Sequence, residues 1–459
     1  MSSGMYLALV LMVMAVAYQW ALVRSKKVVH HDTRQLHSRP AYYGWSVALW
    51  CGIPAVLVLL TWFLIEPFWL QSMIVSALPP EIATGLDSRQ TAVLMQRIQN
   101  LASGFSGSES VAAHEQLAAQ QFSELKNQSR MVLLVLIGLI MLSLLVFRLQ
   151  RLHANYRARN HVERVIRIAL TLCSAIAILT TVGIVLAMLG EAFRCFSFVS
   201  PMDFFFGTTW NPRFSSTSGG DMGYFGLLPV LVGTMMVSVI ALLVAVPLGL
   251  MTAIYLAEYA SPRFRALAKP TLEVLAGIPT IVYGVFALIV IGPLFNYLGG
   301  LVGLEIRATS ALTAGFVMGI MIIPFVSSLS DDVITQVPRA MRDGSLGLGA
   351  TKAETITKVI IPAALPGIVG AFLLAASRAI GETMIVVLAA GKSPILHGNP
   401  LDAVGTVTVS IVNQLTGDTD FASPQSLVAF ALGLTLFAIT LLLNVVALYI
   451  VRKYREQYE

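Results

Sequence analysis

A cation and a carboxylate stand close together in one apolar segment of the chain. Arg378 lies in the middle of an expected membrane span, residues 366–390, and Glu382 follows four residues later. Residues four apart share one face of a helix. A charge at the centre of a bilayer costs about 2.5–3.5 kcal/mol on insertion scales, so such residues normally face a cavity or a partner. The pair is therefore a candidate functional site.

Two kinds of chemistry fit this pair. In the first, Arg378 and Glu382 neutralise each other as a structural ion pair. In the second, Arg378 binds a tetrahedral oxyanion, because its guanidinium offers a planar fork of donors and stays charged at any working pH. Glu382 would then accept a hydrogen bond from a protonated oxygen, which hydrogen phosphate has and sulfate lacks. The residue types alone leave both interpretations open.

The composition places these residues in a membrane protein. Of 459 residues, 56% are hydrophobic and 12% are charged, and the mean hydropathy is +0.78. Soluble domains carry about 25% charged residues. The net charge of +6 arises from basic runs beside apolar segments, which is typical of membrane topology signals and does not indicate nucleic-acid binding.

Nine segments are long enough to cross a bilayer, which takes roughly 20 apolar residues. The sequence therefore predicts an all-α integral membrane protein. The expected spans lie near residues 5–23, 43–65, 131–147, 166–188, 227–255, 271–294, 309–330, 366–390 and 427–451.

Basic residues predict the orientation of these spans. They gather in every second connection, at residues 24–39, 148–167, 263–269, 339–358 and 452–455. All of these connections become cytoplasmic if the amino terminus is outside and the carboxyl terminus is inside. We therefore expect a multi-pass protein of the bacterial cytoplasmic (inner) membrane.

Two parts are expected along the chain. Residues 161–459 form a six-span unit, and residues 1–160 are an extension of three spans. Between the second and third spans, residues 66–130 are polar. Val93, Leu94, Ile98 and Leu101 repeat there at helical spacing. Asp87 and Gln90 have the spacing of a capping box. We predict a helical hairpin outside the membrane.

The internal loop at residues 338–365 does not resemble a simple linker. Apolar spacing predicts a short amphipathic helix over residues 350–361, and Gly347 and Gly349 permit a sharp turn before it. Pro362 is expected to break the chain before the next span. Another glycine–proline pair, Gly277 and Pro279, interrupts the sixth span. These two residues are candidates for a gate, and a simple packing kink is the competing interpretation.

The internal loop resembles the "EAA" loop of permeases of ATP-binding-cassette (ABC) importers. That motif has Glu-Ala-Ala, three residues, Gly, nine residues, then Ile-x-Leu-Pro. The resemblance implies a coupling helix that docks on a separate ATPase subunit, and an ordinary interfacial helix is the alternative. The matching positions and their neighbours are Asp343, Gly344, Ser345, Gly349, Ala350, Val359, Ile361 and Pro362, with Gly344 and Ser345 departing from the motif.

Two further runs resemble the permease subunits of phosphate-specific ABC importers. They are residues 377–384, Ser-Arg-Ala-Ile-Gly-Glu-Thr-Met, and residues 275–284. The resemblance covers the six-span unit and favours the C-type (PstC-like) subunit over the A-type. It implies that phosphate passes along Arg378, Glu382, Ser377 and Thr383. The three extra spans depart from the short form of the family.

The resemblance implies a set of partners. They are a second homologous (A-type) permease, two cytoplasmic ATPase subunits, an external phosphate-binding protein, inorganic phosphate and membrane lipid. We expect no cofactor, metal site or catalytic residue in this chain, so the ATPase partner would hydrolyse ATP. The alternatives are a permease for molybdate or sulfate, a membrane phosphate sensor or scaffold, and a carrier driven by an ion gradient.

Overall fold

The computed structural model describes residues 3–29, 33–77, 88–103, 113–213, 223–417 and 423–454. The contacts divide the chain into two compact units, Met1–Ile178 and Leu179–Glu459. Within the described ranges, nine helices are long and apolar enough to cross a membrane, and the all-helical membrane fold is confirmed. They run over Gly4–Val28, Pro40–Ala77, Glu115–Gln150, Ala158–Cys195, Leu228–Tyr259, Thr280–Val302, Ala311–Gln336, Lys352–Ile380 and Pro424–Lys453.

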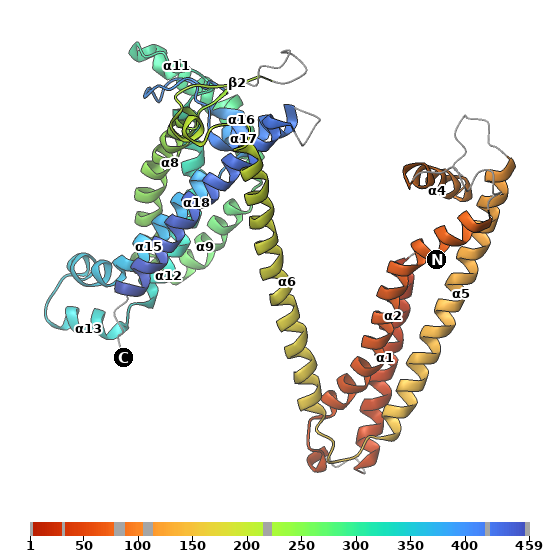
Figure 1. The fold of residues 1–459 in the computed structure, drawn as a ribbon. Helices are drawn as coiled ribbons and strands as arrows, with labels where there is room; N and C mark the ends of the chain where they lie inside the picture. The colour runs from red at the N-terminus through yellow and green to blue at the C-terminus, as the bar shows by residue number, and fades with distance from the viewer. Residues whose placement is uncertain are drawn as a thin grey trace. The chain divides into compact units, whose positions relative to one another are not determined.

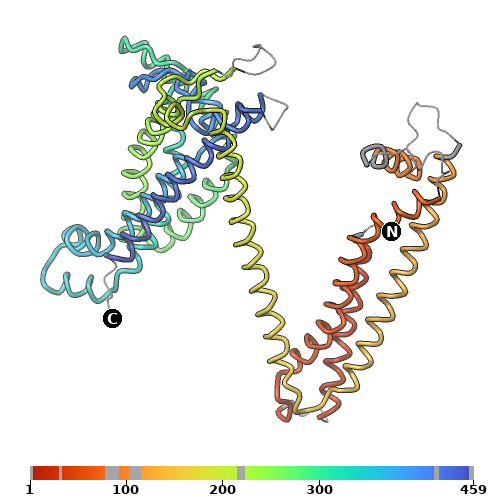
Figure 2. Tube along the Cα trace, in the orientation of Figure 1, coloured from red at the N-terminus to blue at the C-terminus, as the bar shows by residue number. Residues whose placement is uncertain are grey.

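The first unit is built around three long helices that run side by side (Figure 2, red to orange). Its elements are α1 (Ser3–Val28), a 3-10 turn (Thr33–Gln35), α2 (Pro40–Ala77), α4 (Ser88–Ala102) and α5 (Ala113–Gln150). Small residues allow α1 and α2 to approach closely, since a Cβ at Gly52 would lie 2.2 Å from Met14 Sδ. The Tyr43 hydroxyl, buried beside α5, donates to the carbonyl of Ala154 at 2.8 Å.

The segment between the second and third spans is helical over much of its length. α2 continues to Ala77 and α5 begins at Ala113, so both helices extend beyond the apolar segments. α4 packs against α5, and the buried Ile98 and Phe122 meet Leu70 and Ile74 of α2. Residues 104–112 and Asp87 lie outside the described residues, and the placement of this hairpin outside the membrane stays a prediction.

One long helix, α6 (Ala158–Cys195), runs through the division between the two units at residue 178. The boundary expected near residue 160 stays a prediction. The apolar window of α6 contains no buried residue. A long apolar helix with no buried residue in its apolar window among the described residues is typical of a membrane span.

The second unit is a helical bundle (Figure 1). A short antiparallel hairpin pairs Trp210 of β1 with Phe225 of β2. The elements before the internal loop are α7 (Pro201–Phe206), β1 (Trp210–Pro212), β2 (Gly223–Phe225), α8 (Leu228–Ile254), α9 (Pro262–Ala276), α10 (Thr280–Phe286), α11 (Gly292–Val302) and α12 (Ala311–Gln336). Those within the internal loop and after it are α13 (Arg339–Gly347), α14 (Lys352–Thr355), α15 (Ile361–Ile380), α16 (Met384–Ala389), α17 (Val407–Gly417) and α18 (Pro424–Tyr454).

α12 is the central helix of this bundle and packs against α8, α9 and α15. Its glycines let α8 approach closely: a Cβ at Gly315 would lie 2.7 Å from the Ile240 Cβ, and one at Gly319 the same distance from the Val244 Cβ. Such close contact between small residues is a common way of packing helices in lipid. α13 lies at one end of the bundle, and α16 and α17 lie at the other (Figure 1).

Two spans of the core are interrupted within their expected bounds. The sixth does not run over residues 271–294, because the chain breaks between Ala276 and Thr280, and the membrane-length helix is Thr280–Val302. The eighth ends at Ile380, ten residues earlier than expected, and begins at Lys352. In both cases a glycine, Gly277 or Gly381, caps the helix that ends.

Candidate functional site

Arg378 lies in the last turn of α15, with its side chain exposed on the surface of this chain. The guanidinium carbon is 5.5 Å from the centre of the Phe325 ring, in a cation–π contact. Across the described residues, no carboxylate lies within ion-pair distance of Arg378. The guanidinium therefore keeps its donors available to a ligand.

Glu382 does not share a helical face with Arg378, and that prediction is wrong. α15 ends at Ile380, and the Glu382 carboxylate turns to the start of α16. Its Oε1 accepts hydrogen bonds from the backbone amides of Met384 at 3.0 Å and Ile385 at 3.5 Å. First-turn amides of a helix have no partner within the helix and attract a carboxylate. Glu382 therefore caps α16 and forms no ion pair with Arg378.

The other two residues of the predicted pathway flank this break. Ser377 is half-buried in α15, and its carbonyl accepts the amide of Gly381 at 3.3 Å. The Thr383 hydroxyl donates to the Gly381 carbonyl at 3.3 Å. The structure thus brings Ser377, Arg378, Glu382 and Thr383 together at one helix break, which the Thr408 hydroxyl ties to α17 by donating to the Glu382 carbonyl at 3.0 Å.

The gating candidates Gly277 and Pro279 lie at the break between α9 and α10. Gly277 ends α9 and Pro279 precedes α10. The Tyr283 hydroxyl donates across the break to the carbonyl of Leu275 at 3.0 Å. α10 packs against α16, where a Cβ at Gly284 would lie 2.8 Å from Leu388 Cδ1. This break is therefore in contact, through α10, with the helix that Glu382 caps.

The predicted coupling loop forms two short helices joined by a turn. α13 carries Asp343, Gly344 and Ser345. Asp343 and Gly344 are exposed. Gly349 has a φ of +88°, a left-handed conformation that favours glycine. Leu348, just before it, is 93% exposed. An apolar side chain in that position is suited to contact with a partner.

The amphipathic helix expected over residues 350–361 differs from the observed one. Ala350 belongs to the turn, and its amide donates to the Ser345 carbonyl at 3.2 Å. The Thr351 hydroxyl and the Glu354 carboxylate then form a capping box that begins α14. The Ser345 and Thr355 hydroxyls lie 3.0 Å apart and link the two helices.

Pro362 does not break the chain, and that prediction is also wrong. A π-helical turn over Ile356–Ile360, which includes Val359, joins α14 to α15. α15 begins at Ile361, and the helix is continuous from Lys352 to Ile380. Proline lacks a backbone N–H and clashes with the preceding turn of a regular α-helix. The wider π turn accommodates both effects.

A cluster of charges near α13 was missed by the sequence analysis. Asp331 on α12 is 1% exposed, and its carboxylate accepts from Arg265 Nη2 at 2.9 Å and from Lys269 Nζ at 2.8 Å. Hydrogen bonds to Asp331 first, and then to Asp332, raise the pKa of Lys269. Arg265 and Lys269 lie four apart on α9, which could have suggested a shared partner, but nothing in the sequence identified Asp331.

A second ion pair supports the same region. Arg342 on α13 lies 3.0 Å from Glu258 Oε1, and it donates to the Ile334 carbonyl at 2.7 Å. Both side chains are largely buried. These contacts fix α13 to the end of α12 and to the π-helical turn Tyr255–Tyr259 that follows α8.

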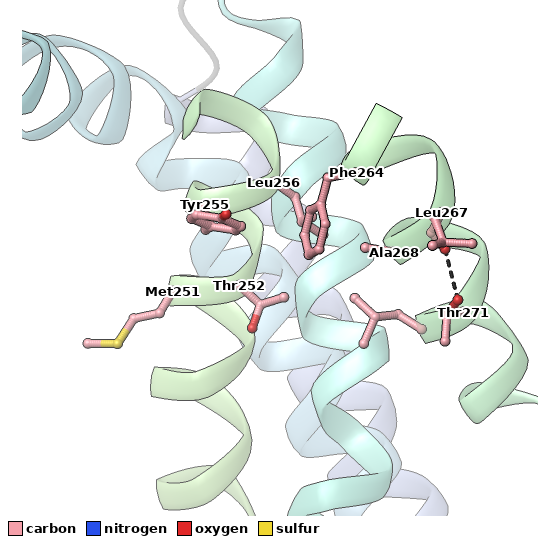
Figure 3. Close-up of a pocket in the computed structure, with 9 residues that line it drawn as sticks. Met251, Thr252, Tyr255, Leu256, Phe264, Leu267, Ala268 and Thr271 are labelled. Atoms are coloured by element: carbon pink, nitrogen blue, oxygen red, sulfur yellow. Dashed lines mark hydrogen bonds between the residues drawn. The ribbon is translucent and has the colours of Figure 1, made fainter. Parts of the chain in front are cut away.

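A cavity at the end of the core nearer α13 is a poor site for an anion. It has a volume of about 570 Å³ and lies between the end of α8 and α9 (Figure 3). No charged residue lines it, and its polar groups are the Thr252, Thr271 and Tyr255 hydroxyls. An anion would lose its hydration there without a cation to replace it. We therefore place the site at Arg378.

Together, the long apolar helices, the helix break beside a free arginine and the exposed loop at the far end define a multi-pass membrane transport subunit. Residues 245–456 match the family described as "Binding-protein-dependent transport system inner membrane component". Residues 7–180 match the family described as "Phosphate ATP-binding cassette transporter".

Named relatives match between half and two thirds of the chain. A probable ABC transporter permease protein, YqgH of Bacillus subtilis, is 32% identical over 60% of this chain and 86% of its own length. The phosphate transport system permease protein PstC of Mesorhizobium japonicum is 32% identical over 62% and 89%. PstC of Haemophilus influenzae is 34% identical over 51% and 78%. The chain belongs to the PstC-type family of ABC transporter permeases.

Proposed function

We propose that this chain is the C-type permease subunit of an ATP-driven importer of inorganic phosphate. Its family membership supports the class of protein, and relatives named as phosphate transport permeases support the substrate. Arg378 carries the proposal at the level of residues. It is an exposed guanidinium at the end of a membrane-length helix, with no acidic partner in the described part of the chain.

The geometry suggests how the anion is held. Arg378 supplies charge-assisted hydrogen bonds to the phosphate oxygens. Glu382 holds the start of α16 in place with one carboxylate oxygen, and Ser377 and Thr383 complete the pathway beside it. Glu382 Oε2 accepts no hydrogen bond from the described residues. It is therefore free to accept a hydrogen bond from the protonated oxygen of hydrogen phosphate, which sulfate lacks at neutral pH.

Movement would reach this site from the opposite end of the bundle. α13 and the exposed Leu348 dock on a cytoplasmic ATPase, and two such subunits serve this chain and an A-type permease. The continuous helix from Lys352 to Ile380 joins that loop to Arg378. An external binding protein delivers phosphate. In this arrangement the amino terminus is outside, the carboxyl terminus is cytoplasmic, and Gly277 and Pro279 form part of a gate.

Uptake of radiolabelled phosphate by the complete transporter in proteoliposomes tests this proposal. A charge-assisted hydrogen bond contributes about 1.5–3 kcal/mol, so Arg378→Gln should slow uptake by roughly 10- to 100-fold. Arg307→Gln is the matched control, because Arg307 is an exposed cation of the same core that pairs with Asp402 at 3.2 Å.

Three results would contradict the proposal. Unchanged phosphate uptake in a correctly assembled Arg378→Gln complex would remove the role of the guanidinium. Competition by sulfate or molybdate as strong as that by unlabelled phosphate would favour a permease for another oxyanion. Loss of function on removal of residues 66–130, with Arg378→Gln tolerated, would favour a sensor or scaffold.

A further inference from the structure

A second cavity of the core is lined by residues of α17 and of the loop that contains Lys392. α16 and α17 lie at the end of the bundle opposite α13 (Figure 1). The volume of this cavity is about 340 Å³, roughly ten times the volume of a water molecule in the liquid. Its wall includes several polar side chains and no acidic residue among the described ones. The polar residues that matter here are Lys392, Ser410, Asn413 and Gln414.

Gln414 on α17 carries two buried polar atoms without partners. The side chain has no exposed surface, and neither its amide oxygen nor its amide nitrogen has a hydrogen-bond partner in the described part of the chain. Burying a polar group without a hydrogen-bond partner is unfavourable. An amide that forms part of a cavity wall and lacks a protein partner is suited to a polar ligand in that cavity.

The backbone before Lys392 holds this lysine at the cavity. Gly391 has a φ of +92°, and a Cβ there would lie 2.7 Å from the Ala403 Cβ, so the turn requires glycine. The amide of Val404 donates to the carbonyl of Ala390 at 2.9 Å and closes the loop. Lys392 is exposed and forms no ion pair within the described ranges.

We propose that this cavity is an outer binding site for an oxyanion, which occupies it before reaching Arg378. Lys392 provides the positive charge, and Gln414, Asn413 and Ser410 provide neutral hydrogen bonds. A cation would be repelled by Lys392, and an apolar ligand would leave the Gln414 amide without a partner. The inference rests on the proposed function, since it takes the translocated phosphate as the ligand and the α16–α17 end as external.

Protection of an introduced cysteine tests the site without requiring transport. Thr416 lines the cavity, is exposed, and bonds only to its own helix through the Val412 carbonyl, so Thr416→Cys adds a thiol beside the site. The exposed native Cys173 is replaced by serine. The assembled transporter without its binding protein is labelled with neutral N-ethylmaleimide, in inorganic phosphate or in chloride of equal ionic strength.

Phosphate at about twice its dissociation constant should slow labelling about threefold. Lys392→Gln and Gln414→Leu, each in the Thr416→Cys background, should abolish this protection. Equal labelling in phosphate and chloride at all concentrations would overturn the proposal. Protection that persists in Gln414→Leu would also overturn the proposal, because it would show that the Gln414 amide does not contribute to binding the anion.

The outcomes separate this inference from the proposed function. Absence of protection together with slow uptake in Arg378→Gln removes the outer site and leaves the phosphate permease intact. Protection together with normal uptake in Arg378→Gln keeps an anion site at the cavity and removes the role of Arg378. A carboxylate ligand supplied by a partner protein predicts no protection by free phosphate, and that result counts against the proposal.

Discussion

Cations at the two ends of the permease core are used in different ways. Near α13, Arg265, Lys269 and Arg342 each contact a buried or largely buried carboxylate. Near α16, Arg378 and Lys392 have no acidic partner among the described residues.

This difference separates structural charges from charges that are available to ligands. A buried carboxylate is stable only when its hydrogen bonds and charge are satisfied, so Asp331 requires its cations and holds α9 against α12. An unpaired cation contributes little to the fold and can be removed at small cost. The comparison predicts that stability and transport respond to substitutions at opposite ends of the bundle.

The largest loss of stability is expected for Asp331→Asn. The change leaves Arg265 and Lys269 without a full negative charge. Breaking a buried ion pair costs about 3–5 kcal/mol, and because each cation is about 30% exposed we expect roughly 2–4 kcal/mol. Unfolding of the purified permease in detergent measures it. Arg378→Gln is the control and should change the free energy of unfolding by less than about 0.5 kcal/mol. Equal losses of stability in Asp331→Asn and Arg378→Gln would contradict the difference between the two ends of the bundle.

A smaller loss is expected for Arg342→Gln. The variant removes the contact with Glu258 at 3.0 Å and the hydrogen bond to the Ile334 carbonyl at 2.7 Å. Leaving such partners unsatisfied costs about 1–3 kcal/mol. Arg342→Lys, which keeps the positive charge, should recover part of the lost stability. The same unfolding assay measures both variants, and wild-type stability in Arg342→Gln would show that α13 is held by other contacts.

The contribution of Lys269 should depend on pH in one direction. Hydrogen bonds to Asp331 and Asp332 raise its pKa above the ordinary value of 10.5. A raised pKa stabilises the fold at all pH values below 10.5 and loses that effect as the pH rises through the folded-state pKa. The stability difference between the wild type and Lys269→Met, about 1 kcal/mol, should stay constant from about pH 6 to 9 and shrink above pH 10.5. A difference that shrinks near pH 7 would contradict the assignment.

The smallest effect is expected for Asp332→Asn. Asp332 lies 3.0 Å from Lys269, but its side chain is 55% exposed. Exposed pairs contribute about 0.2–1 kcal/mol. Asp332→Asn is therefore the matched partner of Asp331→Asn, with the same chemical change on the adjacent residue. A loss as large as that of Asp331→Asn would mean that burial does not decide the effect.

The sequence was sufficient for the fold class and insufficient for the helix breaks. Long apolar runs must be helical in a membrane, so the nine spans could be predicted from composition and length. Whether Glu382 continues α15 or caps α16 depends on which amides are nearby, and a spacing of four residues does not contain that information. The glycine–proline break after Ala276 was located correctly. The close contact of Gly284 on α10 with α16 depends on tertiary packing, which the sequence pattern does not contain.

The predicted coupling loop shows the same limit. The glycine at residue 349 predicted a sharp turn, and its left-handed backbone agrees. Pro362 suggested a break because proline disfavours a regular helix, yet the chain accommodates it with a π turn. Asp331 could not be identified as the partner of Arg265, because the two residues are 66 positions apart in the chain.

The π turn at Ile356–Ile360 also fixes how the two ends of one long helix are rotated with respect to each other. It accommodates one residue more than a regular turn, so everything beyond it is offset around the helix axis by roughly 100°, the angle of one residue. Deleting a single residue there would let the helix close into a regular spiral. Arg378 would then point to a different side of the bundle while α13 kept its place, so the direction in which the guanidinium points is set some twenty residues before it in the chain.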